Sequence, residues 1–374
     1  MAEIVIERRP GSELGGPAGA IDFDLAGIAG VRLLGASTGD AAAVERQLGP
    51  IRRPLERTPD VVVRFVERLP AAGETRYLGV NDAGFTDTGF LVLRGKHKAR
   101  ARVQIPLDRA GAGCEIVCEH GVPAVPLLVP LLNLAVLSRG ILPLHASAFV
   151  HKGVGVVATG WSKGGKTEAL LACAAAGATY VGDEWVYIDR DGSRVSGIPE
   201  PIRVWNWHLR EQPQLRSRLG RNERLRLGML AGVGGLLRTT GRLNRVRALT
   251  ETQRYVDLEP AVIFGARQAT SMSFDRLVFV MSQASPEVVV SAIDPQEVAR
   301  RMVFSLGYER RDLLAYYQAF RFAFPGSSSP VIEASSELER DLLERAFADK
   351  PAHAVAHPYP VRFPALLDAI ERCC

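Results

Sequence analysis

The chain has 374 residues, a formal net charge of +5 at pH 7 and 23% charged residues. Its 47% hydrophobic content is that of an ordinary globular chain that can bury a core, and excludes a largely disordered protein. At this length we expect two domains, or one large domain with additions.

The sequence predicts neither export nor insertion into a membrane. Residues 1–10 are charged and hold no apolar segment of the kind that secretion signals need. The longest apolar stretch, Val122–Leu137, contains three prolines and is too short to cross a bilayer. The five cysteines are scattered and form no disulfide framework. We therefore expect a cytoplasmic location.

Residues 1–120 predict a β-rich N-terminal domain, because short apolar and alternating runs follow one another there. A short helix is expected over Ala41–Leu48, and a solvated hairpin tip over Gly95–Lys98. The expected strands are Ile4–Ile6, Val61–Val66, Gly89–Arg94, Ala99–Leu107 and Glu115–Cys118.

Cys114, Cys118 and His120 could suggest a metal site near the end of this region. A fourth ligand is missing, and cysteine also packs as a small apolar residue. We favour a strand with inward-facing cysteines.

A helix is predicted over Pro123–Arg139, and Gly140 ends it. A β-hairpin is predicted after this helix. His145–Gly160 contains two apolar runs with a turn near Lys152-Gly153. Folding the chain about that turn sets His145 opposite Thr159 or Gly160. We expect a functional role for this histidine, at the mouth of the loop that follows.

That loop, G-W-S-K-G-G-K-T, has the phosphate-loop pattern. A β-branched strand precedes it and an Ala- and Leu-rich helix, Thr167–Ala176, follows it, which is the order that phosphate binding requires. The glycines let backbone N–H groups approach a nucleotide, Lys166 reaches the β- and γ-phosphates, and Thr167 contacts Mg²⁺. The predicted nucleotide-binding residues are Gly160, Trp161, Ser162, Lys163, Gly164, Gly165, Lys166 and Thr167.

Two adjacent acids, Asp183 and Glu184, lie in a predicted strand over Ala178–Asp189. Phosphate-loop proteins keep the acid that handles Mg²⁺ at such a place. Neighbours on a strand point to opposite faces, so the pair can share a ligand only if the strand bends. We expect one acid on the metal and the other to accept a proton from an attacking hydroxyl.

His145, the loop and the Asp183-Glu184 pair together resemble the kinase core of the HPr kinase/phosphorylase family, over roughly Leu142–Ile188. The resemblance implies a fold related to that of phosphoenolpyruvate carboxykinases. It also implies ATP-dependent phosphorylation of a hydroxyl, typically of serine, with Asp183 near the acceptor and His145 assisting. Three residues depart from the family pattern: Glu184 replaces an Asp, Lys163 replaces a glycine, and Trp161 is bulky. The first 120 residues match no part of the family, and its downstream glycine-rich segment with an arginine is not clearly present.

An Arg-rich insert is predicted at about 203–254, with twelve arginines against Glu211, Glu223 and Glu251. It could grip an acidic peptide or phosphorylated substrate, or contact nucleic acid or an anionic membrane. It could equally be helices with solvated arginine faces. Arg203 and Arg254 are candidates for the arginine that stabilises the transferring phosphate.

The remaining chain predicts α/β completion. His353 and His357 share one strand face, but no acids accompany them, so a metal pair is not favoured. Ser336 to Glu339 has a capping-box pattern, and Cys373-Cys374 is interpreted as a frayed tail. The expected strands are Leu277–Met281, Pro330–Ala334 and His353–Tyr359, and the expected helices are Gln296–Leu306, Arg311–Phe322, Ser336–Ala348 and Phe363–Cys373.

The sequence thus predicts an α/β fold, with a β-rich domain over residues 1–120 and a phosphate-loop kinase domain with a mixed sheet and flanking helices over 121–374. The expected activity is an ATP- and Mg²⁺-dependent kinase acting on a hydroxyl, with a peptide or protein serine favoured over a small alcohol or sugar. A nucleotide-binding regulator and a nucleic-acid-associated ATPase stay open, as does a homo-oligomer. The predicted catalytic residues are Asp183, His145 and Lys166, and the predicted metal ligands are Thr167, Glu184 and Asp183.

Overall fold

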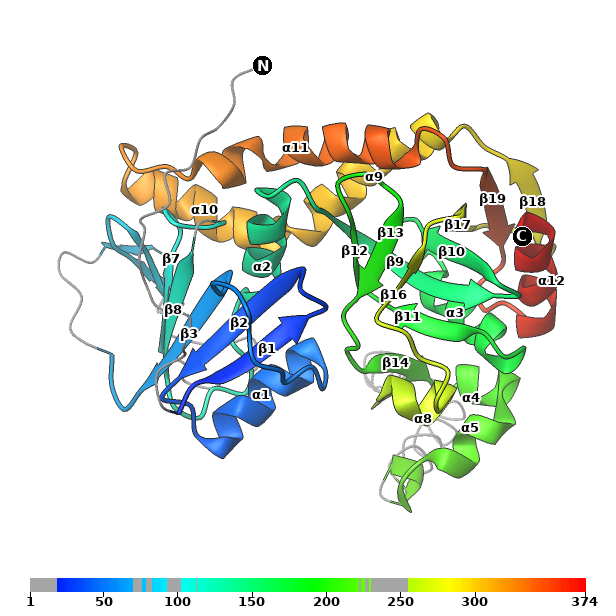
Figure 1. Cartoon of the computed structure of the whole chain (residues 1–374), viewed down its shortest axis with the longest axis horizontal. Helices are drawn as coiled ribbons and strands as arrows, with labels where there is room; N and C mark the ends of the chain where they lie inside the picture. The colour runs from blue at the N-terminus through cyan, green and yellow to red at the C-terminus, as the bar shows by residue number, and fades with distance from the viewer. Residues whose placement is uncertain are drawn as a thin grey trace, which may run out of the picture.

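The computed structural model describes residues 19–69, 76–78, 83–92, 102–111, 113–221, 223–225, 229 and 255–374. These residues form a mixed α/β structure with two large sheets side by side, and three helices run along one side of both (Figure 1). The expected α/β fold with mixed sheets and flanking helices is therefore confirmed. No helix among these residues is both long and apolar enough to cross a membrane.

The first sheet has eight strands in the order β1-β2-β3-β8-β7-β6-β5-β4. β3 pairs in parallel with both β2 and β8, and the other pairs are antiparallel. The expected strand over Val61–Val66 is confirmed, whereas Ile4–Ile6 and the hairpin tip at Gly95–Lys98 lie outside the described residues. The strands are β1 (Ile21–Leu25), β2 (Ala29–Leu34), β3 (Val61–Val66), β4 (Arg76–Leu78), β5 (Ala83–Phe85), β6 (Gly89–Val92), β7 (Val103–Pro106) and β8 (Cys114–Glu119).

Cys114 and Cys118 point into the core of this sheet, as expected. Burial raises the pKa of each thiol to about 12, so both behave as apolar residues. His120 lies next to Asp40 of α1 (Thr38–Leu48), with 2.6 Å between its Nδ1 and the carboxylate.

The second sheet is built on β10, β17 and β19, which are parallel neighbours. β9 pairs with β10 on one side, and β12, β13 and β16 extend the sheet beyond it; β18 forms the opposite edge. The strands are β9 (Leu142–His151), β10 (Val154–Thr159), β11 (Thr179–Gly182), β12 (Trp185–Ile188), β13 (Arg194–Gly197), β16 (Ser271–Ser273), β17 (Arg276–Ser282), β18 (Val289–Ala292) and β19 (Ala352–His357), and β14 (Ile202–Trp205) pairs separately with β15 (Tyr255–Leu258).

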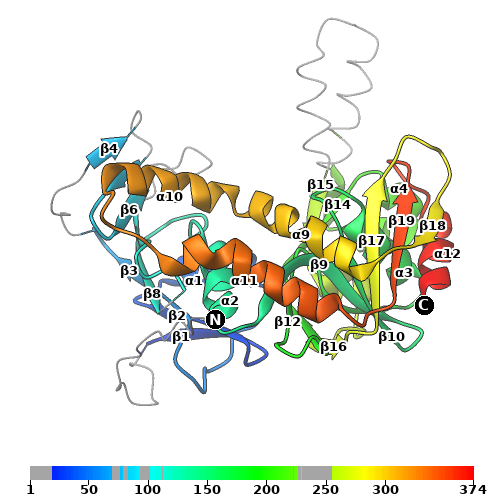
Figure 2. The same ribbon diagram turned by 90° about the horizontal axis from the view of Figure 1, so that it is seen from above.

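Helices cover this sheet on both faces. α3 and α12 pack together on one face, and α9 and α11 lie against the other (Figure 2). α10 continues from α9 and reaches β4 and β6 of the first sheet. The remaining helices are α2 (Leu128–Leu137), α3 (Lys166–Ala175), α4 (His208–Glu211), α5 (Pro213–Arg218), α8 (Pro260–Phe264), α9 (Pro295–Glu309), α10 (Arg311–Ala323), α11 (Pro330–Phe347) and α12 (Phe363–Cys373).

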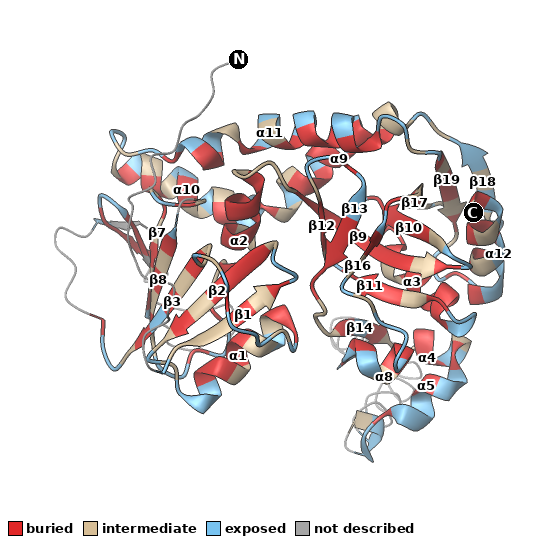
Figure 3. Ribbon diagram, in the orientation of Figure 1, coloured by how far each residue is buried: buried red, intermediate tan, exposed pale blue. Residues whose placement is uncertain are grey.

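The two sheets share one hydrophobic core. Its buried side chains run from Phe23 of β1, through the leucines of α2, to Leu144 of β9 and Phe347 of α11. Buried positions line the facing sides of these elements in both halves (Figure 3). This core connects the two sheets on either side of the proposed division at residue 120, and a second cluster of buried side chains lies around α3 and α12. The division itself stays a prediction.

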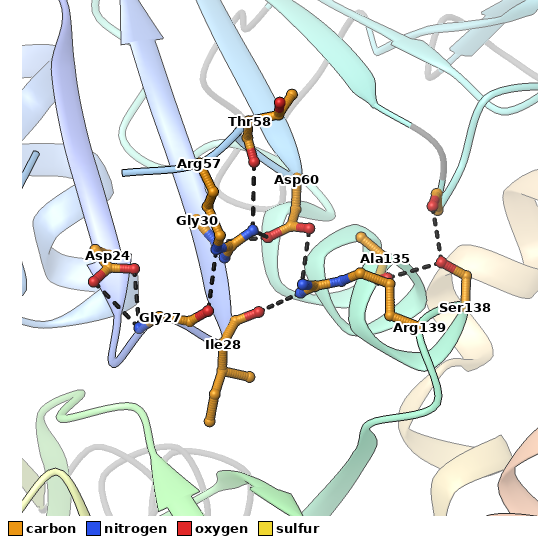
Figure 4. Close-up of polar contacts among 11 residues, drawn as sticks. Asp24, Gly27, Ile28, Gly30, Arg57, Thr58, Asp60, Ala135, Ser138 and Arg139 are labelled. Carbon is orange, nitrogen blue, oxygen red and sulfur yellow. Dashed lines mark hydrogen bonds and ion pairs between the residues drawn. The ribbon is translucent and has the colours of Figure 1, made fainter. Parts of the chain in front are cut away.

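Polar contacts also tie the first sheet to α2. Asp60, just before β3, accepts the backbone N–H of Gly30 and pairs with Arg57 (Nη1 at 2.9 Å) and with Arg139, which follows α2 (Nη2 at 3.2 Å). Arg139 also donates to the carbonyl of Ile28 (Figure 4). A half-buried carboxylate in this region is therefore matched by cations from two directions.

Two predicted elements are wrong. Pro330–Ala334 is not a strand but the first turn of α11, because proline suits a helix start, where an N–H is not needed, and Val331 and Ile332 begin a buried stripe with helical spacing. Ser336 is therefore inside the helix and caps nothing. Its hydroxyl and the buried carboxylate of Glu339 contact Arg310 instead.

The predicted strand over Ala178–Asp189 is also wrong, because the chain turns at the two acids. The N–H of Trp185 donates to the carbonyl of Asp183 at 2.8 Å, and Glu184 between them has φ +64°. This γ-turn separates β11 from β12, and both strands pair with the long strand β9.

Candidate active site

The β9–β10 hairpin fixes the position of His145. Thr159 pairs with Ala146, so His145 lies one position further toward the loop, as the sequence predicted. The turn is Lys152-Gly153, both with positive φ. The hydroxyl of Thr159 donates to the carbonyl of His145 at 3.2 Å, and the imidazole is buried.

The glycine loop, Gly160–Thr167, connects β10 to α3 and fits only because of its glycines. Gly160 has φ +154° and Gly165 has φ +111°. A Cβ on Gly160 would lie 2.3 Å from the carbonyl oxygen of Val280, and one on Gly165 would lie 2.0 Å from the Nε2 of His357. The neighbouring strands thus hold the loop in a conformation that side chains at these positions would prevent.

His357, at the end of β19, contacts the backbone of this loop. Its Nε2 lies 3.0 Å from the carbonyl oxygen of Gly164, and its Nδ1 lies 2.8 Å from that of Pro358. The structure thus gives His357 a structural contact that sequence reasoning missed. Among the described residues, no group of three or more His, Cys, Asp or Glu side chains is arranged to hold a metal ion.

Lys166 opens α3 and folds back over the loop. Its Nζ is 3.0 Å from the carbonyl oxygen of Trp161 and 3.5 Å from that of Gly160, and its side chain is buried. Burial lowers the pKa of this ammonium group. Lys166 therefore lies where it can exchange these carbonyls for phosphate oxygens.

Asp183 joins three elements of the site. Its carboxylate accepts the hydroxyl of Thr167 (2.9 Å) and the hydroxyl of Ser147 from β9. Burial, and next the charge of Glu184, raise the pKa of Asp183 from 3.8 to about 7. Although burial opposes them, His145 and Lys166 lower the pKa of Glu184 to about 2, so the acid whose ionisation the site disfavours is Asp183, and a cation beside Thr167 would favour its charged form.

Thr167 and Asp183 are a donor set that Mg²⁺ accepts, because this ion takes a hydroxyl or one or two carboxylates and completes its shell with water and phosphate oxygens. Thr167 lies in the first turn of α3, where the helix dipole favours phosphate groups, and Asp183, which follows β11, contacts it there. The residues present therefore fit a magnesium–nucleotide complex.

His145 lies between two carboxylates, only one of which the sequence predicted. Its Nε2 is 2.9 Å from Oε2 of Glu184, and its Nδ1 is 3.1 Å from Oε1 of Glu309, the last residue of α9. The second contact is an ion pair whose angles fall outside those of a hydrogen bond. Burial and Lys166 lower the pKa of His145, but the two carboxylates outweigh them and raise it.

Glu200 is a second acid that the sequence did not single out. Burial, and then the charges of Glu184 and Asp183, raise its pKa well above the ordinary value. Its Oε1 is buried and accepts no hydrogen bond from the described residues. Neither Glu200 nor Glu309 belongs to a motif, so sequence spacing gave no signal for them.

Trp161 lies at the outer edge of the site. Its half-exposed ring contacts the ring of Tyr308 in α9, with 4.9 Å between centroids. Of the two candidate arginines, Arg203 pairs with Asp257 at 3.0 Å and stacks on Tyr255. Arg254, and most of the insert at about 203–254, lies outside the described residues.

No protein-family model matches the chain, and neither does any curated protein sequence. Among solved structures, a weak neighbour is the HPr(Ser) kinase/phosphatase from Coxiella burnetii. The alignment has 13% identity and a TM-score of 0.22, and it covers 40% of this chain and 72% of that chain. A similarity this low identifies neither the fold nor the activity, so the case for a function depends on the site itself.

Proposed function

We propose that this chain is an ATP- and Mg²⁺-dependent kinase that transfers the γ-phosphate to a hydroxyl, with a peptide or protein serine as the favoured acceptor. The single observation that carries the proposal is the position of Asp183. This carboxylate lies against Thr167 at the end of the glycine loop, and its raised pKa suits a group that accepts a proton near neutral pH.

The other side chains have complementary roles in this proposal. The backbone amides of the loop and Lys166 bind the phosphates, and Thr167 with Asp183 or Glu184 holds the metal. Mg²⁺ would neutralise charge on the transferring group. Asp183 orients the acceptor hydroxyl and takes its proton, while His145 lies beside Glu184 and adds positive charge at the far end of the phosphates.

Labelled ATP mixed with separate pools of serine peptides and of small alcohols or sugars tests this function. We expect Mg²⁺-dependent transfer to peptides, and Lys166→Ala should lower it by a factor on the order of 10² to 10³. Transfer that survives Lys166→Ala would contradict the assignment.

The same assay separates the alternatives. Label found only in the small-molecule pool would favour a kinase of alcohols or sugars. ATP binding without transfer to either pool would favour a nucleotide-binding regulator.

A further inference from the structure

The contact between Glu309 and His145 is the part of the site that the proposed roles leave unexplained. Glu309 ends α9, far along the chain from the β9–β10 hairpin, and yet its Oε1 lies 3.1 Å from Nδ1 of His145. The imidazole is only 5% exposed and the Glu309 side chain 20% exposed. Placing a carboxylate this far out of water is costly unless it contacts a partner.

The structure around Glu309 holds it in place. The next residue, Arg310, is buried and pairs with the buried Glu339 of α11, so the junction of α9 and α10 is fixed. The ring of the preceding residue, Tyr308, contacts that of Trp161 in the glycine loop in a tilted arrangement. The last turn of α9 therefore contacts both the loop and the histidine.

Glu309 and Glu184 contact opposite nitrogens of one ring. A partner on one imidazole nitrogen sets the ring orientation and thereby the direction in which the other nitrogen points. With Nδ1 held by Glu309, Nε2 is directed at Oε2 of Glu184, 2.9 Å away, in the γ-turn that also carries Asp183. We propose that Glu309 is a positioning residue that orients His145 toward the Asp183-Glu184 pair. This inference rests on the proposed function only for its kinetic consequence.

The orientation can be tested without turnover. In ¹⁵N-histidine NMR spectra of the full chain, the ring N–H signals of His145 are those that disappear in His145→Gln. We expect Glu309→Ala to broaden or shift the Nδ1–H signal. Glu309→Gln should do the same, because the contact is an ion pair without hydrogen-bond angles and a neutral amide does not replace the carboxylate charge. Glu297→Ala is the matched control, since Glu297 is a half-exposed acid of the same helix that pairs with Arg300 and Arg301, away from His145. A His145 signal unchanged by Glu309→Ala would overturn the proposal.

The kinetic readout is hydrolysis of MgATP with water as the acceptor. Glu309→Ala should lower kcat about 10- to 100-fold, as loss of an orienting partner commonly does, with KM for MgATP nearly unchanged. Glu309→Gln should lower kcat as well, because it removes the charge of the ion pair, and so should Glu309→Asp, because its shorter chain withdraws the carboxylate from Nδ1.

These variants also separate the two hypotheses. If Glu309→Gln matches the parent protein both in the NMR spectra and in kcat, the carboxylate charge is not what holds the ring and the proposal is wrong. If Lys166→Ala abolishes turnover while Glu309→Ala and Glu309→Asp match the parent protein, only this inference fails. If hydrolysis survives Lys166→Ala, the proposed function fails, whatever the NMR spectra show.

Discussion

Carboxylates that are buried or half-buried have opposite surroundings in the two sheets. In the first sheet, Asp60 is matched by Arg57 and Arg139 (Figure 4), and Asp40 by His120 and backbone N–H groups. Near the γ-turn at Glu184, burial and the charge of Glu184 raise the pKa of Asp183, and burial with the charges of Glu184 and Asp183 raises the pKa of Glu200. The first arrangement stabilises the folded chain, whereas the second is costly, and such a cost is commonly found at functional sites.

The largest expected effect comes from Asp183→Asn. Removing the proton acceptor should lower phosphate transfer by a factor on the order of 10² to 10⁴. The same change should stabilise the metal- and nucleotide-free protein, because it removes a buried charge. The rate of transfer and the free energy of unfolding, measured on the same samples, should move in opposite directions.

The stabilisation by Asp183→Asn should depend on pH. The folded-state pKa of Asp183 is raised, so ionisation disfavours the fold. The advantage of the asparagine variant should be absent below about pH 4, grow toward about pH 7 and then stay constant. An advantage that shrinks as pH rises through this range would contradict the comparison between the two sheets.

Asp40→Asn should have an effect of intermediate size, and it should destabilise the folded chain where Asp183→Asn stabilises it. Asp40 accepts from Ser37, from the N–H of Gly121 and from His120, and although burial opposes it, these contacts lower its pKa from 3.8 to about 2. The variant should lose about 2 kcal/mol of unfolding free energy at pH 7, with unchanged transfer per folded molecule. A carboxylate whose pKa is lowered by folding stabilises the folded chain at pH values above its unfolded-state pKa. The difference in unfolding free energy between the parent protein and the variant should therefore vanish as pH falls from about 4 to about 2. Urea unfolding across this range measures it.

Arg64→Ala should have the smallest effect. Arg64 and Glu115 pair across β3 and β8 at 2.5 Å, but their side chains are 45% and 44% exposed. Exposed pairs contribute less than about 1 kcal/mol, so the unfolding midpoint should barely move and salt should reduce the difference further. If Arg64→Ala loses as much unfolding free energy as Asp40→Asn, the exposure of a contact does not determine how much it stabilises the folded chain.

Sequence reasoning recovered what adjacent residues determine. The register of the β9–β10 hairpin, the glycine loop and α12 follow from turn residues, motif spacing and helical periodicity. The γ-turn at Glu184 was missed because an apolar run on both sides of two acids fits one strand as well as two, and pairing with β9 decides between them. Glu309 and Glu200 were missed because only tertiary packing brings them to His145 and Asp183.

The start of α11 shows the same limit in another form. Pro330–Ala334 reads equally well as a short strand, and its place against α9 and α2 makes it helical. Local propensity was outweighed there by the apolar stripe that the other helices bury.

The core that both sheets share limits how the chain can be cut into separate folding units. Leucines of α2 pack against strands of both sheets, and α10 closes the first sheet while α9, its direct neighbour, carries Glu309 to the second. Neither half could be exchanged as an independent module without exposing the interior of the other. The α9–α10 junction therefore joins a helix that contacts the first sheet to the helix end that lies beside His145.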